Sequence, residues 1–158
     1  MTSETALWFM DTRVSIVVPA ASGEDRLSVI KHWAPYGNSP PLHIHDTEDE
    51  VFHVLEGQVQ FNVDGATVTV TAGQTIMAPK GIPHSYLVVS EGGAKWLTMT
   101  SPGDFEGLVR ALSRPATAAG LPDPHGPPSA EAAEHLMKVC AAHNIRMVGA
   151  PMRLAEAA

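Results

Sequence analysis

The sequence predicts a mainly β domain, an antiparallel sandwich or small barrel, followed by C-terminal α-helices. Between Arg13 and Thr100, short β-branched runs alternate with Gly, Pro, Asn and Asp, which is typical of short antiparallel strands. Asp64-Gly65 separates two of these runs and favours a two-residue hairpin, because both central residues of a type I′ turn need positive φ. After Thr100 the apolar residues recur at helical spacing instead.

The expected strands are short and numerous, and the absence of an internal repeat favours one barrel over a duplicated pair. They cover residues 14–18, 27–33, 51–55, 59–63, 66–70, 74–78, 85–89 and 94–100. A further strand is expected at His43 and His45. Their side chains then share one face, because residues two apart on a strand point the same way.

A first helix is expected after the strands, with Ser101 as its cap and Pro102 in its first position. Pro115 is expected to end this helix, because proline cannot continue it. The apolar stripe of the helix consists of Phe105, Leu108, Val109 and Leu112.

Residues 115–128 carry five prolines and two glycines, which indicates a surface loop. A second helix is expected from Ser129 to about Asn144, with Cys140 as a small buried hydrophobic residue on its apolar stripe. A short strand is expected at residues 145–148, and the end of the chain from residue 154 is expected to fray. Residues 1–100 are therefore assigned to a barrel with N-terminal strands. Residues 101–158 are assigned to a helical extension packed on it within the same domain.

The composition restricts the classes of partner. A formal net charge of −7 and a pI near 5.5 disfavour nucleic acid and anionic membrane surfaces, because no Lys/Arg stripe is available to neutralise phosphates. Cys140 is the only cysteine, so no intrachain disulfide can form, which fits a reducing compartment. The first residues show no signal-peptide pattern, and no apolar run approaches the length of a membrane helix. We therefore expect a cytoplasmic protein.

Four residues are candidate ligands of one divalent transition metal: His43, His45, Glu50 and His84. Imidazoles combined with a carboxylate suit Fe, Mn, Ni, Co, Cu or Zn. The lack of thiolates excludes a metal site that is built from soft sulfur ligands. Such a set also leaves coordination positions open for a substrate or dioxygen. The alternatives are that these are ordinary surface or core polar residues, or that the metal site is vestigial or purely sensory.

Two stretches around these residues resemble the signature motifs of the cupin superfamily. The first is Gly37-x5-His43-x-His45-x4-Glu50-x6-Gly57, and the second is Gly73-x5-Pro79-x-Gly81-x2-His84. The final Asn of the second family motif is Val88 here, at a position that is not usually a ligand. The resemblance covers about residues 25–100. The tail of the chain is similar to that of single-domain cupins labelled quercetin 2,3-dioxygenase-like.

The resemblance implies a double-stranded β-helix, or jelly-roll, barrel with a metal in its mouth, held by His43, His45, Glu50 and His84. Glu48 and Asp49 fit the motif spacing less well, and we interpret them as a solvated turn. The resemblance further implies a metal-dependent dioxygenase acting on a small hydroxylated aromatic or enolic substrate. Glu50 is then also a catalytic residue that accepts the proton of the substrate hydroxyl, although a plain ligand role fits equally.

Two other functions remain open for the same residues. One is a non-oxidative metal cupin of secondary metabolism, such as an isomerase, cyclase or lyase, in which the metal acts as a Lewis acid. The other is a small-molecule-binding cupin without catalysis. Turnover without dioxygen would favour the former, and retention of an unchanged small molecule would favour the latter.

Several aromatic and apolar residues are candidate walls of a substrate pocket, although aromatics in a barrel more often belong simply to the core. The candidates are Phe52, Val54, Phe61, Tyr86 and Trp33, with Trp96 beside them. His53 is out of phase with Glu50 and is expected to face away from the metal. His32 is expected on the outer face of the sheet or in an interface.

A homodimer is expected, because barrels of this kind commonly pair through sheet edges. The N-terminal segment carries Trp8 and Phe9, and these aromatics suggest that it crosses to the partner.

Overall fold

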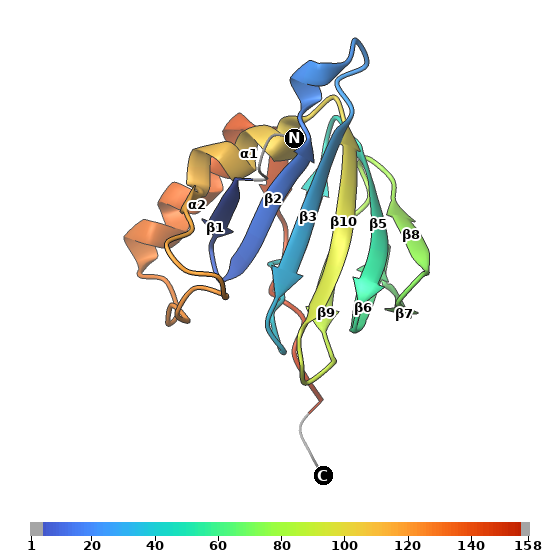
Figure 1. The fold of residues 1–158 in the computed structure, drawn as a ribbon, viewed down its shortest axis with the longest axis vertical. Helices are drawn as coiled ribbons and strands as arrows, with labels where there is room; N and C mark the ends of the chain where they lie inside the picture. The colour runs from blue at the N-terminus through green and yellow to red at the C-terminus, as the bar shows by residue number, and fades with distance from the viewer. Residues whose placement is uncertain (1–4, 156–158) are drawn as a thin grey trace.

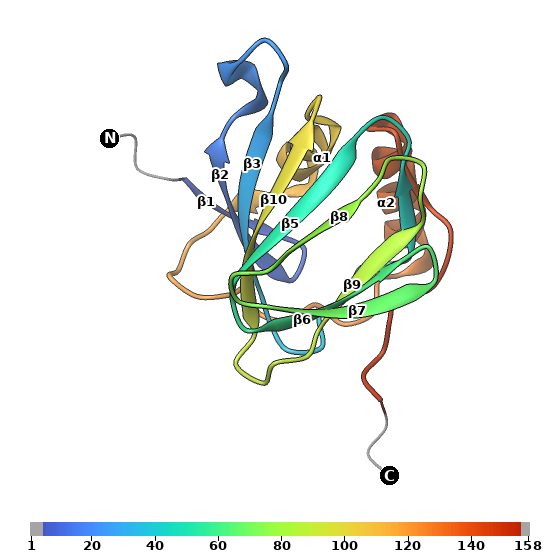
Figure 2. The same cartoon turned by 90° about the vertical axis from the view of Figure 1, so that its right-hand side faces the viewer.

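Two antiparallel sheets face one another across the core of the computed structural model, which describes residues 5–155 (Figures 1 and 2). The larger sheet has the strand order β11-β1-β2-β3-β10-β5-β8, and the smaller sheet has the order β12-β4-β9-β6-β7. The strands are β1 (Ala6–Phe9), β2 (Thr12–Val18), β3 (Ser28–Ala34), β4 (His43–His45), β5 (Asp49–Glu56), β6 (Gln58–Val63), β7 (Ala66–Thr71), β8 (Thr75–Ala78), β9 (His84–Val88), β10 (Ala94–Ser101), β11 (Arg114–Pro115) and β12 (Ile145–Met147).

The jelly-roll architecture predicted from the sequence is confirmed. Every strand expected from the β-branched runs is present, and the structure adds the short strands β1 and β11 at one side of the larger sheet. The hairpin at Asp64-Gly65 is also confirmed, because these residues have φ values of 52° and 81°. The alternation of buried and partly exposed residues along β5 places Glu50, Phe52 and Val54 on the inner face, as expected.

Two α-helices cover one end of the barrel: α1 (Asp104–Leu112) and α2 (Ala130–Ala142) (Figure 2). The expected start of α1 is wrong. Ser101 still pairs with Asp49 as the last residue of β10, so it cannot cap the helix. Gly103 occupies the N-cap position with a φ of 93°, and the backbone N–H groups of Asp104 and Phe105 donate to the Glu48 carboxylate.

The end of α1 also differs from the expectation, because the helix stops at Leu112. Arg114 and Pro115 then pair with β1 and do not simply terminate a helix. The prediction for α2 is confirmed. The Ser129 hydroxyl accepts a hydrogen bond from the Ala132 N–H over 3.1 Å, and Asn144 has a positive φ of 60° after the last turn. The strand expected after α2 is β12, which pairs with β4.

The helices bury their apolar sides against the barrel and against each other. Val109 of α1 packs with Val14 and Ile30 beneath the larger sheet. Leu108 packs with Cys140 and Ile145 at the junction with α2 and β12. Burial of a Val or Leu side chain contributes about 1.5–3 kcal/mol, so these contacts fix the helices over the barrel mouth. Residues 156–158 of the end that was expected to fray lie outside the described residues.

The N-terminal segment packs within its own chain. Strand β1 pairs with β2 and β11, and the indole N–H of Trp8 donates to the Gly120 carbonyl oxygen over 3.1 Å. Phe9 contacts Phe105 edge to face, with ring centroids 6.2 Å apart. These aromatics therefore give no ground for a segment that crosses to a partner, while the homodimer itself stays a prediction. Within residues 5–155, no helix is long and apolar enough to span a membrane.

Candidate metal centre and its cavity

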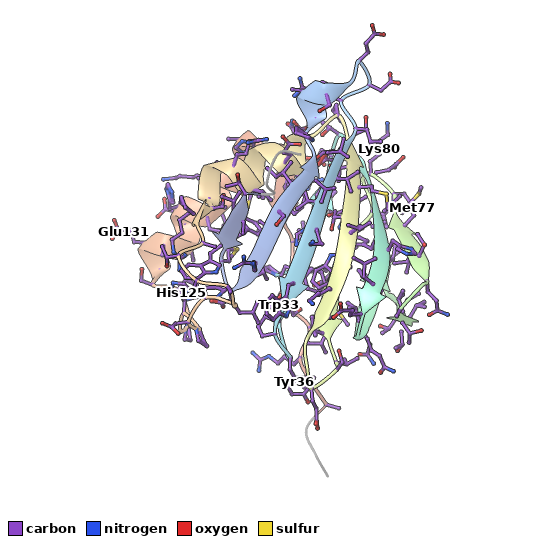
Figure 3. All side chains as sticks on the ribbon, in the orientation of Figure 1. Trp33, Tyr36, Met77, Lys80, His125 and Glu131 are labelled. Carbon is purple, nitrogen blue, oxygen red and sulfur yellow. The ribbon has the colours of Figure 1, made fainter. Side chains whose placement is uncertain are left out.

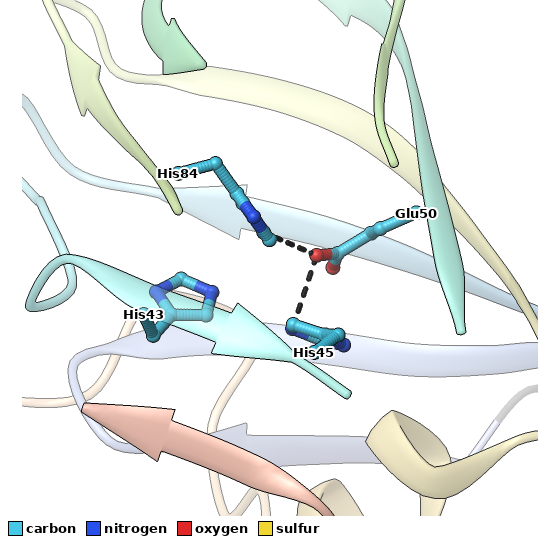
Figure 4. A group of neighbouring side chains, drawn as sticks. All are labelled: His43, His45, Glu50 and His84. Carbon is cyan, nitrogen blue, oxygen red and sulfur yellow. Dashed lines mark hydrogen bonds and ion pairs between the residues drawn. The ribbon is translucent and has the colours of Figure 1, made fainter. Parts of the chain in front are cut away.

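The four candidate ligands come from three strands in two sheets. His43 and His45 lie on β4, His84 opens β9, and Glu50 reaches them from β5 of the other sheet (Figure 4). His43 and His84 are directly paired across β4 and β9. One donor atom from each of the four side chains lies within 4.8 Å of all the others. The positions predicted from the motif spacing thus converge on one point between the sheets.

The Glu50 carboxylate is at the centre of the cluster. Its Oε2 atom lies 2.8 Å from His84 Nε2 and 3.2 Å from His45 Nε2. The side chains of all three residues are almost completely buried. The ring of His43 lies 4.4 Å from that of His84, measured between centroids, and completes the cluster.

The other ring nitrogen of each histidine is held by a fixed acceptor. His43 Nδ1 lies 2.7 Å from the Pro41 carbonyl oxygen, and His84 Nδ1 lies 3.1 Å from the Ile82 carbonyl oxygen. A carbonyl oxygen only accepts, so these Nδ1 atoms carry hydrogen, and Nε2 is left with its lone pair in the neutral ring. This orientation is the one that metal-binding histidines adopt.

A cation fits the arrangement that results. Nε2 lone pairs and a carboxylate oxygen converge at distances of 2.8–3.2 Å, where acceptors repel one another unless a proton or a metal ion lies between them. The donor set, three imidazoles and one carboxylate, suits the divalent transition metals.

The charges in the cluster respond to burial and to each other. Burial, together with the neighbouring His84, lowers the pKa of His43 to about 4. Burial alone would raise the pKa of Glu50, but the adjacent His45 and His84 lower it to about 2. Burial would lower the pKa of His45, yet Glu50 and Glu48 raise it above its usual value. The cluster therefore keeps a carboxylate anion that compensates a positive charge in its centre.

Glu48 is not part of a solvated turn, which corrects the interpretation from the sequence. Its side chain is buried, and its Oε1 atom accepts from His45 Nδ1 over 3.2 Å and from the Phe105 N–H over 2.6 Å. Its Oε2 atom accepts from the Asp104 N–H over 3.0 Å. Asp49 is exposed, as expected, and binds the backbone N–H of Lys80. Glu48 thus orients a candidate ligand from behind, while Glu50 is the carboxylate in the cluster.

A cavity of about 160 Å³ opens beside the cluster. Its wall contains His43, His45 and Glu50 together with aromatic residues of the barrel and apolar residues of the helices. Of the predicted pocket residues, Phe52 and Tyr86 line this cavity. The Tyr86 hydroxyl donates to Asn38 Oδ1 over 3.0 Å, and burial raises the pKa of Tyr86 well above its usual value.

The other predicted pocket residues lie elsewhere. Val54 and Phe61 belong to the closed core of the barrel and do not contribute to the cavity wall. Trp33 is on the opposite face of β3, where the Lys95 ammonium lies 5.2 Å from its ring centroid (Figure 3). His53 faces away from the cluster, as predicted, and pairs with Thr75.

His32 and Trp33 exchange their expected positions. Residues 28, 30, 32 and 34 of β3 are the buried set, so His32 points inward and Trp33 outward. The His32 ring stacks on Trp96, with centroids 5.1 Å apart and planes at 3°, and on Phe105 at 5.8 Å and 17°. His32, Trp96 and Phe105 all line the cavity. No pattern in the sequence indicates the role of His32, because an alternating strand can place either His32 or its neighbours Lys31 and Trp33 on the inner face.

The comparison with known families identifies the central part of the chain. Residues 29–100 match the family described as Cupin domain, Cupin_2. This segment is a cupin domain. It runs from β3 to β10 and therefore includes all four candidate metal ligands.

Individual relatives of this chain are distant. A quercetin 2,3-dioxygenase from Bacillus subtilis is 29% identical over 100 residues, which are 63% of this chain and 29% of that protein. The chain thus matches less than a third of the length of this curated relative.

Solved structures share the fold at low sequence identity. A predicted oxalate decarboxylase from Thermotoga maritima has a TM-score of 0.59 and 18% identity, covering 63% of this chain and 94% of that chain. The polyketide cyclase RemF from Streptomyces resistomycificus has a TM-score of 0.51 and 22% identity, covering 64% of this chain and 70% of that chain. At these identities the likeness establishes the fold alone.

Proposed function

We propose that this cupin is a metal-dependent dioxygenase that acts on a small hydroxylated aromatic or enolic compound. His43, His45, Glu50 and His84 would hold one divalent transition metal per chain. The observation that carries the proposal is the convergence of three imidazoles and one carboxylate within 4.8 Å, at the wall of a cavity. The distant similarity to a quercetin 2,3-dioxygenase supports the choice of reaction class.

The chain supplies three elements of such a reaction. A metal bound here would polarise a substrate oxygen and bring it together with dioxygen. The apolar and aromatic wall would hold a flat ligand and exclude water from it. The Glu50 carboxylate lies among the ligand nitrogens, with Oε2 2.8 Å from His84 Nε2, so we assign to it the acceptance of the proton of a substrate hydroxyl.

The decisive experiment combines metal analysis with oxygen uptake. The purified protein is assayed for Fe, Mn, Ni, Co, Cu and Zn, then reconstituted with each metal and supplied with flavonols and catechols in an oxygen-electrode cell. We expect one metal per chain and oxygen consumption that depends on both metal and substrate. A metal-loaded protein that consumes no oxygen with any of these compounds contradicts the proposal.

The same cluster would also serve a non-oxidative reaction, because a divalent metal acts as a Lewis acid without any change of redox state. The shared fold with the polyketide cyclase RemF motivates this second candidate. Substrate conversion under strict anaerobiosis distinguishes the two, since a dioxygenase stops without dioxygen and a cyclase or isomerase does not.

A further inference from the structure

The cavity next to the metal cluster is small. Its volume is about 160 Å³. An engineered apolar cavity of about 150 Å³ accommodates benzene. Leu108, Leu136 and Cys140 of the helices form part of the wall, so the C-terminal extension limits the space in front of the barrel. A flavonol carries three rings, whereas a cavity of this size holds about one.

One polar group of the cavity wall lacks a partner. Within residues 5–155, His32 Nε2 is the buried side-chain nitrogen or oxygen without a hydrogen bond. Other polar side chains of the wall make at least one hydrogen bond each: Asn38 accepts from Tyr86, Thr98 accepts from Trp96, and Thr12 donates to the Phe9 carbonyl oxygen. A buried polar atom that makes no hydrogen bond is costly and calls for an explanation, and a ligand is one.

His32 is not one of the four side chains that converge as candidate ligands. The ring of Phe105 contacts both histidines, with its centroid 5.8 Å from that of His32 and 5.9 Å from that of His45. Burial lowers the pKa of His32 to about 4, so the ring is uncharged at neutral pH. A neutral imidazole matches a hydroxyl or carbonyl group better than a carboxylate.

We propose that the cavity binds a compound of single-ring size, with its hydroxyl or enol oxygens toward the metal cluster and a second, uncharged polar group hydrogen-bonded to His32. This inference rests on the proposed function and narrows its substrate class. His32 would then determine the specificity for this second polar group, while Trp96 and Phe105 hold its ring in place.

The test uses two probes of equal shape and one larger compound. The probe 3,4-dihydroxybenzyl alcohol carries a hydroxyl that both donates and accepts, and 4-ethylcatechol has a methyl group in its place. Quercetin tests the size limit. Their dissociation constants are measured by isothermal titration calorimetry on the full chain loaded with Zn²⁺, which does not turn over the catechol, and on the metal-free chain.

We expect the benzyl alcohol to bind the wild-type protein about tenfold more tightly than 4-ethylcatechol, the difference that one hydrogen bond makes. His32→Phe keeps an aromatic ring against Trp96 and should remove this difference, whereas His32→Gln retains a polar group and should restore part of it. Trp33→Phe is the matched control on the other face of β3 and should change neither affinity. Quercetin should bind at least about tenfold more weakly than either probe.

Three outcomes overturn the inference: quercetin binding as tightly as the single-ring probes, no binding of either single-ring probe, or an unchanged preference in His32→Phe. A second measurement needs no substitution. In wild-type protein labelled with ¹⁵N-histidine, the benzyl alcohol should shift the His32 Nε2 resonance, and 4-ethylcatechol should not. Equal shifts with both probes also contradict the role of His32. The titrations of the metal-free chain test the role of His32 independently of the metal. The proposed function fails by a different result, namely that the protein binds no metal.

Discussion

Glu48 connects His45 to the N-terminus of α1. A single buried carboxylate accepts the Nδ1–H of the candidate ligand over 3.2 Å and the backbone N–H groups of the first helical turn over 2.6 Å and 3.0 Å. Through this contact the C-terminal extension reaches the metal cluster. The extension therefore contacts the site through Glu48 and also lines the cavity with residues of its helices.

The first prediction concerns Glu48. Replacement by Ala should lower the affinity for the metal by about 10–100-fold, the usual effect of losing a group that orients a ligand. Metal affinity is measured by competition with a chelator, and the melting temperature of the metal-free form reports the loss of the helix cap separately. Glu56→Gln is the control, because Glu56 at the far end of β5 forms an exposed ion pair with Lys95 of β10. An unchanged metal affinity in Glu48→Ala would refute the orienting role.

The second prediction distinguishes the ligands from their neighbours. Glu50→Gln and His84→Ala should weaken metal binding by more than about 100-fold, since a lost ligand costs more than a lost orienting contact. His53→Ala should leave binding unchanged, because His53 lies on β5 but pairs with Thr75 outside the cluster. Metal per chain after dialysis, measured by elemental analysis, checks this. Full metal content in His84→Ala would exclude the proposed ligand set.

The third prediction is a pH dependence that originates from His32. Its pKa is about 4 in the folded chain and 6.5 when unfolded, so below pH 6.5 the unfolded state takes up a proton that the folded state does not. The free energy of unfolding of the protein with neutral His32 therefore has its full value above pH 6.5, and it decreases as the pH falls toward 4. Between these values, the wild-type protein should lose about 3 kcal/mol of unfolding free energy relative to His32→Phe.

This difference is measured by urea unfolding of both proteins at a series of pH values. Glu50 is the charged group that acts on His32, and it is present in both proteins. The comparison therefore isolates the histidine. Parallel pH profiles for the two proteins would show that His32 is not a buried neutral group.

The fourth prediction concerns the turn after β5. Gly57 has a φ of 82°, and a Cβ atom there would lie 2.5 Å from the Gly93 carbonyl oxygen. Gly65 has a similar φ of 81° but no atom within 4 Å of a built Cβ. Gly65→Ala should cost about 1–2 kcal/mol through the left-handed backbone, and Gly57→Ala should cost about 1–3 kcal/mol more through the clash. Equal losses in chemical denaturation would contradict the steric explanation.

The sequence by itself determined the strands, the hairpin and the four residues of the His/Glu cluster. Short β-branched runs and an Asp-Gly turn are local signals, so they can be recognised in the sequence before any strand pairing is known. His43, His45, Glu50 and His84 could be predicted because side chains alternate on strands and because the spacing matches the cupin motifs.

Only the tertiary structure decided the wall of the cavity and the contacts behind the ligands. The parity of β3 depends on its pairing with β2 and β10, and a shift of one residue exchanges His32 and Trp33 between the faces. The burial of Glu48 depends on Asp104 and Phe105, more than fifty residues further along the chain. Such contacts are long-range, and no local pattern encodes which distant backbone N–H groups a carboxylate will meet.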